Sequence, residues 1–204
     1  MKISLNLKKC IFAVPFGTLL GQIICKDGVC VDPSKVVVII NMEPPHNVKQ
    51  LKSTLGHIGY YRHFNKNYAS ITALMEKLLK RTEVFIWNED CQAKLNKLKE
   101  KLVSAPILVY LDLNKMFHVH IDASRMALGV VLAQPGERNM DYLVYYASRK
   151  LSTAERNYTT TKREALANGL FSAKVQALLI GGMLLSNLSP TPHSLIPDTT
   201  SPYY

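Results

Sequence analysis

The order of the runs in residues 117–175, three strand-like and then one helical, constrains the fold more than any other feature of this chain. The strand-like runs are short, rich in β-branched and aromatic residues, and separated by short connections. The last run has apolar residues at helical spacing. The four runs are Phe117 to Asp122, Ala127 to Gln134, Tyr142 to Leu151 and Ala154 to Val175. The sequence therefore predicts three strands followed by one helix.

The first part of the chain contains another strand-like region. Within residues 10–31, apolar runs lie on both sides of Asp27 and Gly28, and Asp-Gly between apolar runs is a strong β-hairpin signal. Asp32 and Pro33 are then suited to begin a helix. The apolar run KVVVIINM that follows is either a short helix or a buried strand.

Three amphipathic helices are expected between residues 47 and 103. Asn47 and Asn88 can cap the first and the third, because an asparagine side chain accepts from the free N–H groups of a first helical turn. Apolar residues recur at helical spacing in each helix, so the middle of the chain is expected to be a helical layer. These residues are Val48, Leu51, Leu55, Ile58 and Tyr61, then Ile71, Leu74, Leu78 and Leu79 (within Tyr68 to Lys80), then Cys91, Leu95, Leu98 and Leu102.

The chain is basic, with 25 lysine and arginine residues against 15 aspartate and glutamate residues and a formal charge of +10. A basic surface attracts polyphosphates and gains affinity by releasing their counterions. This favours an anionic partner such as nucleic acid. The alternative is a surface excess of charge that only keeps the protein in solution.

Lys49, Lys52, Tyr60, Tyr61 and Arg62 are candidate nucleic-acid contacts, since cations reach phosphates and aromatic rings cover riboses or bases. The alternatives are a solvated helix face for the lysines and core positions for the tyrosines. The expected exposed face of the helices also carries Lys66, Lys77, Lys80, Lys94, Lys97, Lys99 and Lys101.

The cysteines form no CxxC pair and have no histidine at zinc spacing. We therefore expect reduced thiols in an intracellular protein, in the cytoplasm or nucleus, without a metal site built on sulfur. The N-terminus lacks the sustained apolar run of a secretory signal. Residues 177–185, an apolar stretch interrupted by two glycines, are about half the length of a membrane-spanning helix and are expected to be buried or poorly formed.

Four segments are predicted: a β-hairpin in residues 1–31, a helical unit in 32–105, a sheet-and-helix unit in 106–176, and a divergent, disordered tail in 177–204. Prolines among serines and threonines from position 187 onward favour disorder. The fold class is α+β.

Two stretches, FHVHIDASRMALGVVLAQ and YYASRKLSTAERNYTTTKREALA, closely resemble the ribonuclease H domain in the Pol polyprotein of gypsy-type LTR retrotransposons. Upstream, LNLKKCIFAVPFGTLLGQIICKDGVCVDPSKV is similar to the last palm strands of that family's reverse transcriptase, and NVKQLKSTLGHIGYYRHFNKNYASIT is similar to its thumb. The stretch VFIWNEDCQAKLNKLKEKLVSAPIL resembles the connection that leads into the ribonuclease H domain. Several motifs in collinear order make chance similarity implausible.

The resemblance implies a palm-end hairpin remnant, a helical thumb and connection, and a truncated ribonuclease H-like domain with a three-stranded antiparallel sheet and one helix. It implies that Asp122 and Glu164 occupy catalytic, Mg²⁺-binding positions, because this hard cation prefers carboxylate oxygens. It also implies that Leu20 and Gly21 hold a template–primer duplex. From the residues alone, the pattern favours a turn residue after a strand for Asp122 and a solvated helix position for Glu164, whereas the pair at 20–21 fits a strand flattened for packing equally well.

The sequence departs from the family in the parts that complete catalysis. It contains neither a YxDD-like motif nor, after Glu164, a TDH-like motif. Two carboxylates are a poor cage for two Mg²⁺ ions, so we expect Mg²⁺ to be weakly held or absent. The family's fourth strand, which would pair with the strand that carries Asp122, is also missing, and the free sheet edge is a candidate surface for self-association.

The sequence thus predicts part of a reverse transcriptase and ribonuclease H polyprotein that binds RNA:DNA hybrid or other nucleic acid, with little or no catalysis by itself. Two alternatives remain open at this point. One is an active Mg²⁺-dependent ribonuclease H that cleaves the RNA strand of hybrids, and the other is a non-functional product of an element remnant.

Overall fold

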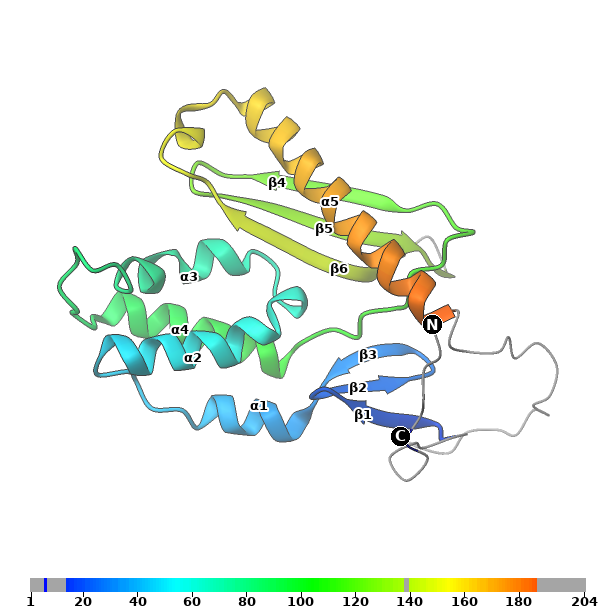
Figure 1. Cartoon of the computed structure of the whole chain (residues 1–204), viewed down its shortest axis with the longest axis horizontal. Coiled ribbons are helices and arrows are strands. Elements are labelled where there is room, and N and C mark those ends of the chain that lie inside the picture. The colour runs from blue at the N-terminus through cyan, green and yellow to red at the C-terminus, as the bar shows by residue number, and fades with distance from the viewer. Residues whose placement is uncertain (1–5, 7–13, 138–139, 187–204) are drawn as a thin grey trace.

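The computed structural model of the protein describes residues 6, 14–137 and 140–186. Two three-stranded antiparallel sheets are connected by a helical layer, which confirms the predicted α+β class (Figure 1). In chain order the elements are β1 (Phe16–Leu19), β2 (Gln22–Cys25), β3 (Gly28–Val31), α1 (Pro33–Ile40), α2 (Val48–Tyr60), the 3-10 helix η2 (Arg62–Phe64), α3 (Tyr68–Lys77), α4 (Glu89–Val103), β4 (His118–Ala123), β5 (Ala127–Pro135), β6 (Asp141–Lys150), the 3-10 helix η4 (Glu155–Asn157) and α5 (Thr160–Ser186).

The predicted hairpin is the second half of a three-stranded meander. β2 pairs with β3 across the Lys26–Asp27 turn, and β1 pairs with the other side of β2. Gly28 follows the turn with a φ of 144°. Val29 and Leu108 exchange two backbone hydrogen bonds, of 2.8 and 3.0 Å, so the first sheet is tied to the segment that follows α4. The apolar residues at positions 10–13 lie outside the described residues.

The apolar run after Asp32 is a helix rather than a strand. The Asp32 carboxylate accepts a hydrogen bond from the Ser34 N–H at 2.9 Å, and Pro33 occupies the first turn, where no N–H is needed. Val36 and Ile39, three positions apart, face the core. The run is helical because its cap is strong and only one side of it is buried.

The helical layer buries the predicted stripes. Asn47 and Asn88 cap α2 and α4 by accepting from N–H groups three residues later, both at 2.9 Å. Together with the first sheet, the helices enclose one apolar core. Its fully buried side chains include Leu51, Ile58, Phe64, Met75, Leu95, Leu98 and Leu102.

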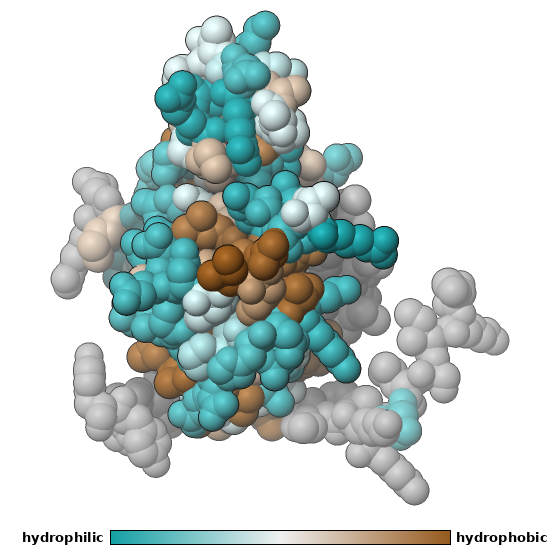
Figure 2. All heavy atoms as spheres, turned by 90° about the vertical axis from the view of Figure 1, so that its left-hand side faces the viewer, coloured by the Kyte–Doolittle hydropathy of each residue, from teal (hydrophilic) through white to brown (hydrophobic). Residues whose placement is uncertain are grey.

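Leu74 is a wrong core prediction. Leu74 is 44% exposed, because α3 buries Ile71, which the stripe included, together with Thr72 and Met75, which it did not. Figure 2 shows an apolar patch ringed by hydrophilic side chains on the end of the molecule where α3 leads toward α4. Val84, in the connection between these helices, is 77% exposed. Helical spacing alone did not reveal which side of α3 faces solvent.

Lys99 is bonded to the C-terminal end of α1 rather than displayed on a free face. Its ammonium group donates to the carbonyl oxygens of Ile40 at 2.8 Å and Met42 at 2.6 Å. The carbonyl groups at a helix end lack intrahelical partners, and a cation there also interacts favourably with the helix dipole. Burial lowers the pKa of Lys99 from its usual value. The prediction that this lysine is exposed was therefore wrong.

Replacing this ammonium group should weaken the contact between α1 and α4. We expect Lys99→Met to lower the free energy of unfolding by about 1–2 kcal/mol, because two carbonyl groups lose a charged donor. Urea unfolding followed by circular dichroism measures the change. Lys97→Met, at an exposed position of the same helix, is the control, and an equal loss in both variants would contradict the assigned role.

The second sheet has the strand order β4-β5-β6 and lies between two helices. α5 packs on one face, over a core that includes Leu128, Val130 and Ala167 (Figure 1). On the other face, the Ala69 N–H at the start of α3 donates to the Ser148 hydroxyl at 3.0 Å. The predicted three-stranded antiparallel sheet is confirmed.

The last helix differs from its predicted bounds. It begins at Thr160, after η4, and continues to Ser186. The predicted boundary at residues 176–177 therefore falls inside α5, and the disorder expected for 177–186 is wrong. Physically, the glycines at 181–182 weaken a helix without stopping it, and the first proline comes only at position 190. The predicted disorder of residues 187–204 lies outside the described residues.

Two further predictions concern thiols and membranes. Cys25, Cys30 and Cys91 are free thiols, and Cys10 lies outside the described residues. Within the described ranges, no helix combines the length and apolarity needed to cross a bilayer.

Candidate nucleic-acid interface

The turn between β1 and β2 is held by two tyrosines at the end of α2. Leu20 and Gly21 have φ values of 50° and 77°, a region that suits glycine but strains leucine by about 1 kcal/mol. The Tyr61 hydroxyl donates to the Gly21 carbonyl at 2.7 Å, and the Tyr60 hydroxyl donates to the Leu20 carbonyl. Tyr61 is buried and Tyr60 is 44% exposed, so the turn is anchored both from the core and from the surface.

A shallow pocket of about 460 Å³ opens beside this turn. A β-carbon added to Gly56, in the pocket wall, would meet nothing within 4 Å, so a ligand can approach the α2 backbone closely. The pocket combines an aromatic edge, two basic side chains and an open helix backbone. Its lining residues are Leu20, Gly21, Lys35, Val38, Ile39, Gly56, His57, Tyr60 and Tyr61.

Lys49 and Lys52 extend this surface along α2. Together with Gly56 and Tyr60 they are spaced by three, four and four residues, which places them on one face of a helix. Both lysines are exposed. We call this set, together with the turn at 20–21, the α2 track. The α2 track joins five of the seven predicted nucleic-acid contacts, and a sixth, Tyr61, lines the adjoining pocket.

Arg62 lies apart from the α2 track. It belongs to η2 and lines a separate pocket of about 210 Å³ with Tyr145 and Tyr146 of β6. Sequence reasoning in turn missed Lys35 and His57. The signal was available, because Lys35 precedes Val38 and Ile39, and His57 precedes Tyr60 and Tyr61, by three and four residues.

Asp122 lies near the end of β4 on the sheet face that α3 covers. Its carboxylate accepts a hydrogen bond from the Asn67 side-chain amide at 3.1 Å. Gly129, opposite Asp122 in the register, leaves room for this contact, since a β-carbon there would lie 2.7 Å from the Asn67 side-chain oxygen. Side chains alternate between the faces of a sheet, so Asp122 projects away from the face on which Val119, Ile121 and Ala123 pack toward α5.

Glu164 is exposed on α5, in the opposite layer. No hydrogen bond or ion pair connects it to Asp122 in the part of the chain that the structure describes. In these same residues, no three histidine, cysteine, aspartate or glutamate side chains are arranged to hold a metal ion. Two Mg²⁺ ions need more oxygen ligands than one carboxylate on each side of a sheet supplies. The described residues therefore do not fit a two-metal centre, and the metal-binding roles of Asp122 and Glu164 remain predictions.

Two histidines of β4 share one carboxylate, an arrangement that sequence reasoning missed. Asp141, at the start of β6, lies 2.7 Å from Nδ1 of His118 and 3.2 Å from Nε2 of His120. These hydrogen bonds lower the pKa of Asp141 from its usual value. The His-x-His spacing on a strand was the available signal, because residues two apart share a face.

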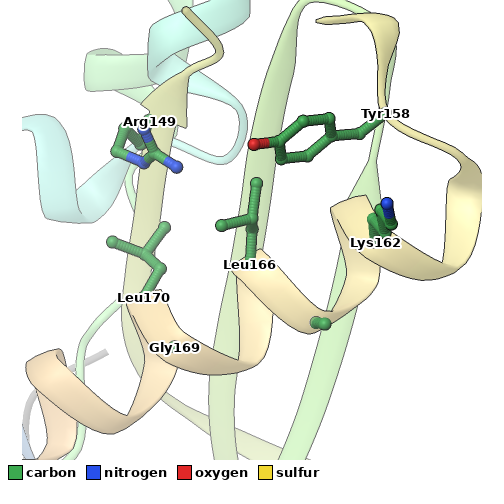
Figure 3. Close-up of a pocket in the computed structure, with 7 residues that line it drawn as sticks. Arg149, Tyr158, Lys162, Leu166, Gly169 and Leu170 are labelled. Carbon is green, nitrogen blue, oxygen red and sulfur yellow. The ribbon is translucent and has the colours of Figure 1, made fainter. Parts of the chain in front are cut away.

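A second open pocket lies between β6 and α5. Arg149 makes a two-pronged ion pair with Glu155, at 3.0 and 3.1 Å, which lowers the pKa of Glu155 to about 2. In Figure 3 the Tyr158 hydroxyl points across the pocket toward Arg149, and Leu166 and Leu170 rise from α5 into the same space. The Arg149 charge is matched by Glu155, so this pocket is less cationic than its residue types suggest.

Known proteins are similar to this chain over most of its length. Residues 87–184 match the family model described as the RNase H-like domain found in reverse transcriptase. The chain is 35% identical over 176 residues to the retrovirus-related Pol polyprotein from transposon opus of Drosophila melanogaster, covering 81% of this chain and 17% of that protein. It is 30% identical over 163 residues to the transposon Tf2-3 polyprotein of Schizosaccharomyces pombe, covering 80% and 12%. The chain thus spans less than a fifth of the length of these relatives.

Solved structures agree on the fold. A foamy viral protease-reverse transcriptase in complex with RNA/DNA hybrid superposes with a TM-score of 0.70 at 22% identity, covering 85% of this chain and 23% of that one. A complex of the foamy viral protein with dsDNA gives 0.70 at 23% identity, covering 84% and 36%.

The family model extends from just before α4 to near the end of α5, and the similar polyproteins cover 80–81% of this chain. Residues 87–184 belong to the RNase H-like domain family found in reverse transcriptase, and the chain is homologous to part of the retrotransposon Pol polyproteins.

Proposed function

We propose that this chain binds nucleic acid, and RNA:DNA hybrid in particular, along the α2 track, with little or no catalysis by itself. The observation that carries the proposal is the continuous line from Lys49 and Lys52 to the pocket beside Leu20 and Gly21. Cations on such a line can follow a phosphate backbone, and the open backbone at Gly56 admits a sugar edge.

Charge and likeness support this proposal. The formal charge of +10 favours a polyanion at long range. The foamy viral proteins of similar fold are described in complex with RNA/DNA hybrid and with dsDNA. The gypsy-type origin of the chain and its location inside the cell, in the cytoplasm or nucleus, are parts of the same proposal.

The weak or absent catalysis rests on the carboxylates. Asp122 is hydrogen-bonded to Asn67 on one side of the sheet, and Glu164 belongs to the helix on the other side. Hydrolysis by two metal ions requires both ions to be fixed a few ångströms apart. We also propose that the outer edge of β4 mediates self-association.

Hybrid binding at several salt concentrations tests the proposal. We expect the logarithm of the association constant to fall linearly with the logarithm of the salt concentration. In Lys49→Gln/Lys52→Gln the affinity at low salt should fall about tenfold, and the slope should decrease by about 2, because two phosphate contacts are lost. Fluorescence anisotropy with a labelled hybrid measures both quantities.

The matched control removes two positive charges elsewhere. Lys80→Gln/Arg81→Gln changes exposed residues that follow α3, so its binding should stay close to that of the parent chain. Equal weakening in both double variants would mean that only net charge matters. In the same samples with Mg²⁺, the RNA strand should remain uncut, and cleavage that Glu164→Gln abolishes would refute the catalytic part of the proposal.

A further inference from the structure

The outer edge of β4 presents backbone groups in a defined pattern. Among the described residues, β4 has a neighbouring strand on one side only. The Ser124 N–H donates to the Ala127 carbonyl at 3.0 Å, in continuation of the β4–β5 register. Hydrogen-bonded and non-hydrogen-bonded pairs alternate along an antiparallel ladder, so the β4 residues at even spacing from Ser124 direct their backbone groups toward β5. Val119, Ile121 and Ala123 therefore direct their N–H and C=O groups outward, away from β5.

An edge of this kind can accept another strand, and its side chains indicate which one. On the face toward α3 it carries His118, His120 and Asp122, and on the other face the half-buried Val119 and Ile121. A strand that supplies a carboxylate opposite His120, a histidine opposite Asp122, and apolar residues on the other face would fit. The β4 strand of a second copy has this pattern when it runs antiparallel.

We propose that two copies of this chain pair through their β4 strands about a two-fold axis at Ile121, which joins their sheets into one six-stranded sheet. In this register His120 of each copy lies opposite the partner's Asp122, in non-hydrogen-bonded pairs whose side chains are close. Ile121 meets the partner's Ile121, and Val119 meets the partner's Ala123, which extends the apolar layer beneath α5.

The competing registers explain why the axis lies at Ile121. Outward-directed residues must face one another, so the axis must pass through a residue rather than between two residues, and the alternatives next to Ile121 are His120 and Asp122. An axis at Asp122 would place two carboxylates directly opposite each other, which is destabilising. An axis at His120 would place that imidazole opposite the partner's identical imidazole and would pair Asp122 with the partner's His118, whose Nδ1 already lies 2.7 Å from Asp141 of its own chain. The axis at Ile121 creates two complementary pairs and no like-charged pair. His120 can still make this contact, because only its Nε2 lies near Asp141.

A charge-exchange experiment on the full 204-residue chain tests the pairing without nucleic acid. Asp122→Lys places a lysine opposite the partner's His120, and His120→Asp places two aspartates opposite each other. Each variant alone should self-associate about tenfold more weakly than the parent chain, because two attractive pairs become repulsive. An equimolar mixture should recover the dimer, since every pair is then complementary. Sedimentation velocity measures the masses, and circular dichroism checks that each variant folds.

A parent chain that stays monomeric over the micromolar range would overturn the proposal. So would variants that dimerise as well as the parent.

Cysteine cross-linking tests the register even if the charged variants fold poorly. Ile121→Cys should form a disulfide-linked dimer under oxidised glutathione, because facing residues lie about 5.5 Å apart between Cα atoms. Val119→Cys should not, since its two copies would be about 13 Å apart. Cross-linking of Val119→Cys alone would overturn the register. Hybrid binding along the α2 track involves other residues, so failure of the dimer leaves that function unaffected.

Discussion

Gly28→Ala is expected to lower the free energy of unfolding by about 3 kcal/mol, through backbone strain and overpacking together. Gly28 has a φ of 144°, which side chains with a β-carbon rarely adopt. An added β-carbon would lie 2.2 Å from the Leu108 carbonyl oxygen and 3.1 Å from the Ile107 side chain. The nearest obstacle is backbone, so the two hydrogen bonds between Val29 and Leu108 must shift. Urea unfolding monitored by circular dichroism measures the loss.

Gly56→Ala is the matched control for this substitution. Gly56 is in the interior of α2, and a β-carbon there meets nothing within 4 Å. Alanine should therefore raise the free energy of unfolding by up to about 1 kcal/mol, because it restricts the unfolded chain and favours helix. A Gly28→Ala variant as stable as the parent would show that the first sheet is not tied to Leu108.

The stability of the protein is expected to fall between pH 6.5 and pH 4 because of His63. Its ring stacks on Tyr145 at 5.7 Å between centroids, and Nε2 lies 3.1 Å from the Gln22 side-chain nitrogen. Burial first, and the nearby Arg62 charge second, lower the pKa of His63 to about 4. The folded state thus keeps this imidazole neutral.

The sign of this effect follows from proton linkage. Below its ordinary pKa of about 6.5 the unfolded chain binds a proton at this position, whereas the folded chain binds it only near pH 4. The stabilisation is complete above pH 6.5 and is lost as the pH falls toward 4, by about 2–3 kcal/mol after allowance for partial exposure. Glu155, whose pKa is lowered to about 2, adds a loss in a lower pH range.

His63→Phe isolates this contribution, because it retains a ring against Tyr145 but cannot bind a proton. We expect its free energy of unfolding to be nearly flat between pH 6.5 and 4.5, as measured by urea titrations at each pH. His46→Gln removes an exposed imidazole and should keep the slope of the parent chain. A parent-like slope in His63→Phe would assign the pH dependence to other groups.

Much of the fold could be predicted from the sequence, because the signals that specify its helices and strands are local. The caps at Asp32, Asn47 and Asn88 act within three residues, and the stripes through Leu51 and Leu95 repeat within one helix. The three strands of the second sheet were found within about two residues at each end. Local period and capping chemistry decide such elements before any long-range contact forms.

Only part of the candidate site could be predicted from the sequence. Lys49, Lys52 and Tyr60 share a helix face by spacing alone, but the pocket exists because the 20–21 turn folds back onto Tyr60 and Tyr61, about forty residues away in sequence. Arg62, adjacent in sequence, points to a different pocket because η2 turns the chain. Spacing within one element cannot describe such contacts between elements.

The amino-acid sequence by itself determined the elements, their order and their likeness to Pol polyproteins, because these depend on residues near one another along the chain. Tertiary structure alone decided that Lys99 caps α1, that Asp122 faces Asn67 rather than α5, and that Asp141 joins the two histidines of β4. A strand side chain can point to either layer until its neighbours are placed. The helices that cover each face of the second sheet therefore decided whether a carboxylate lies next to a cationic group, an amide or solvent.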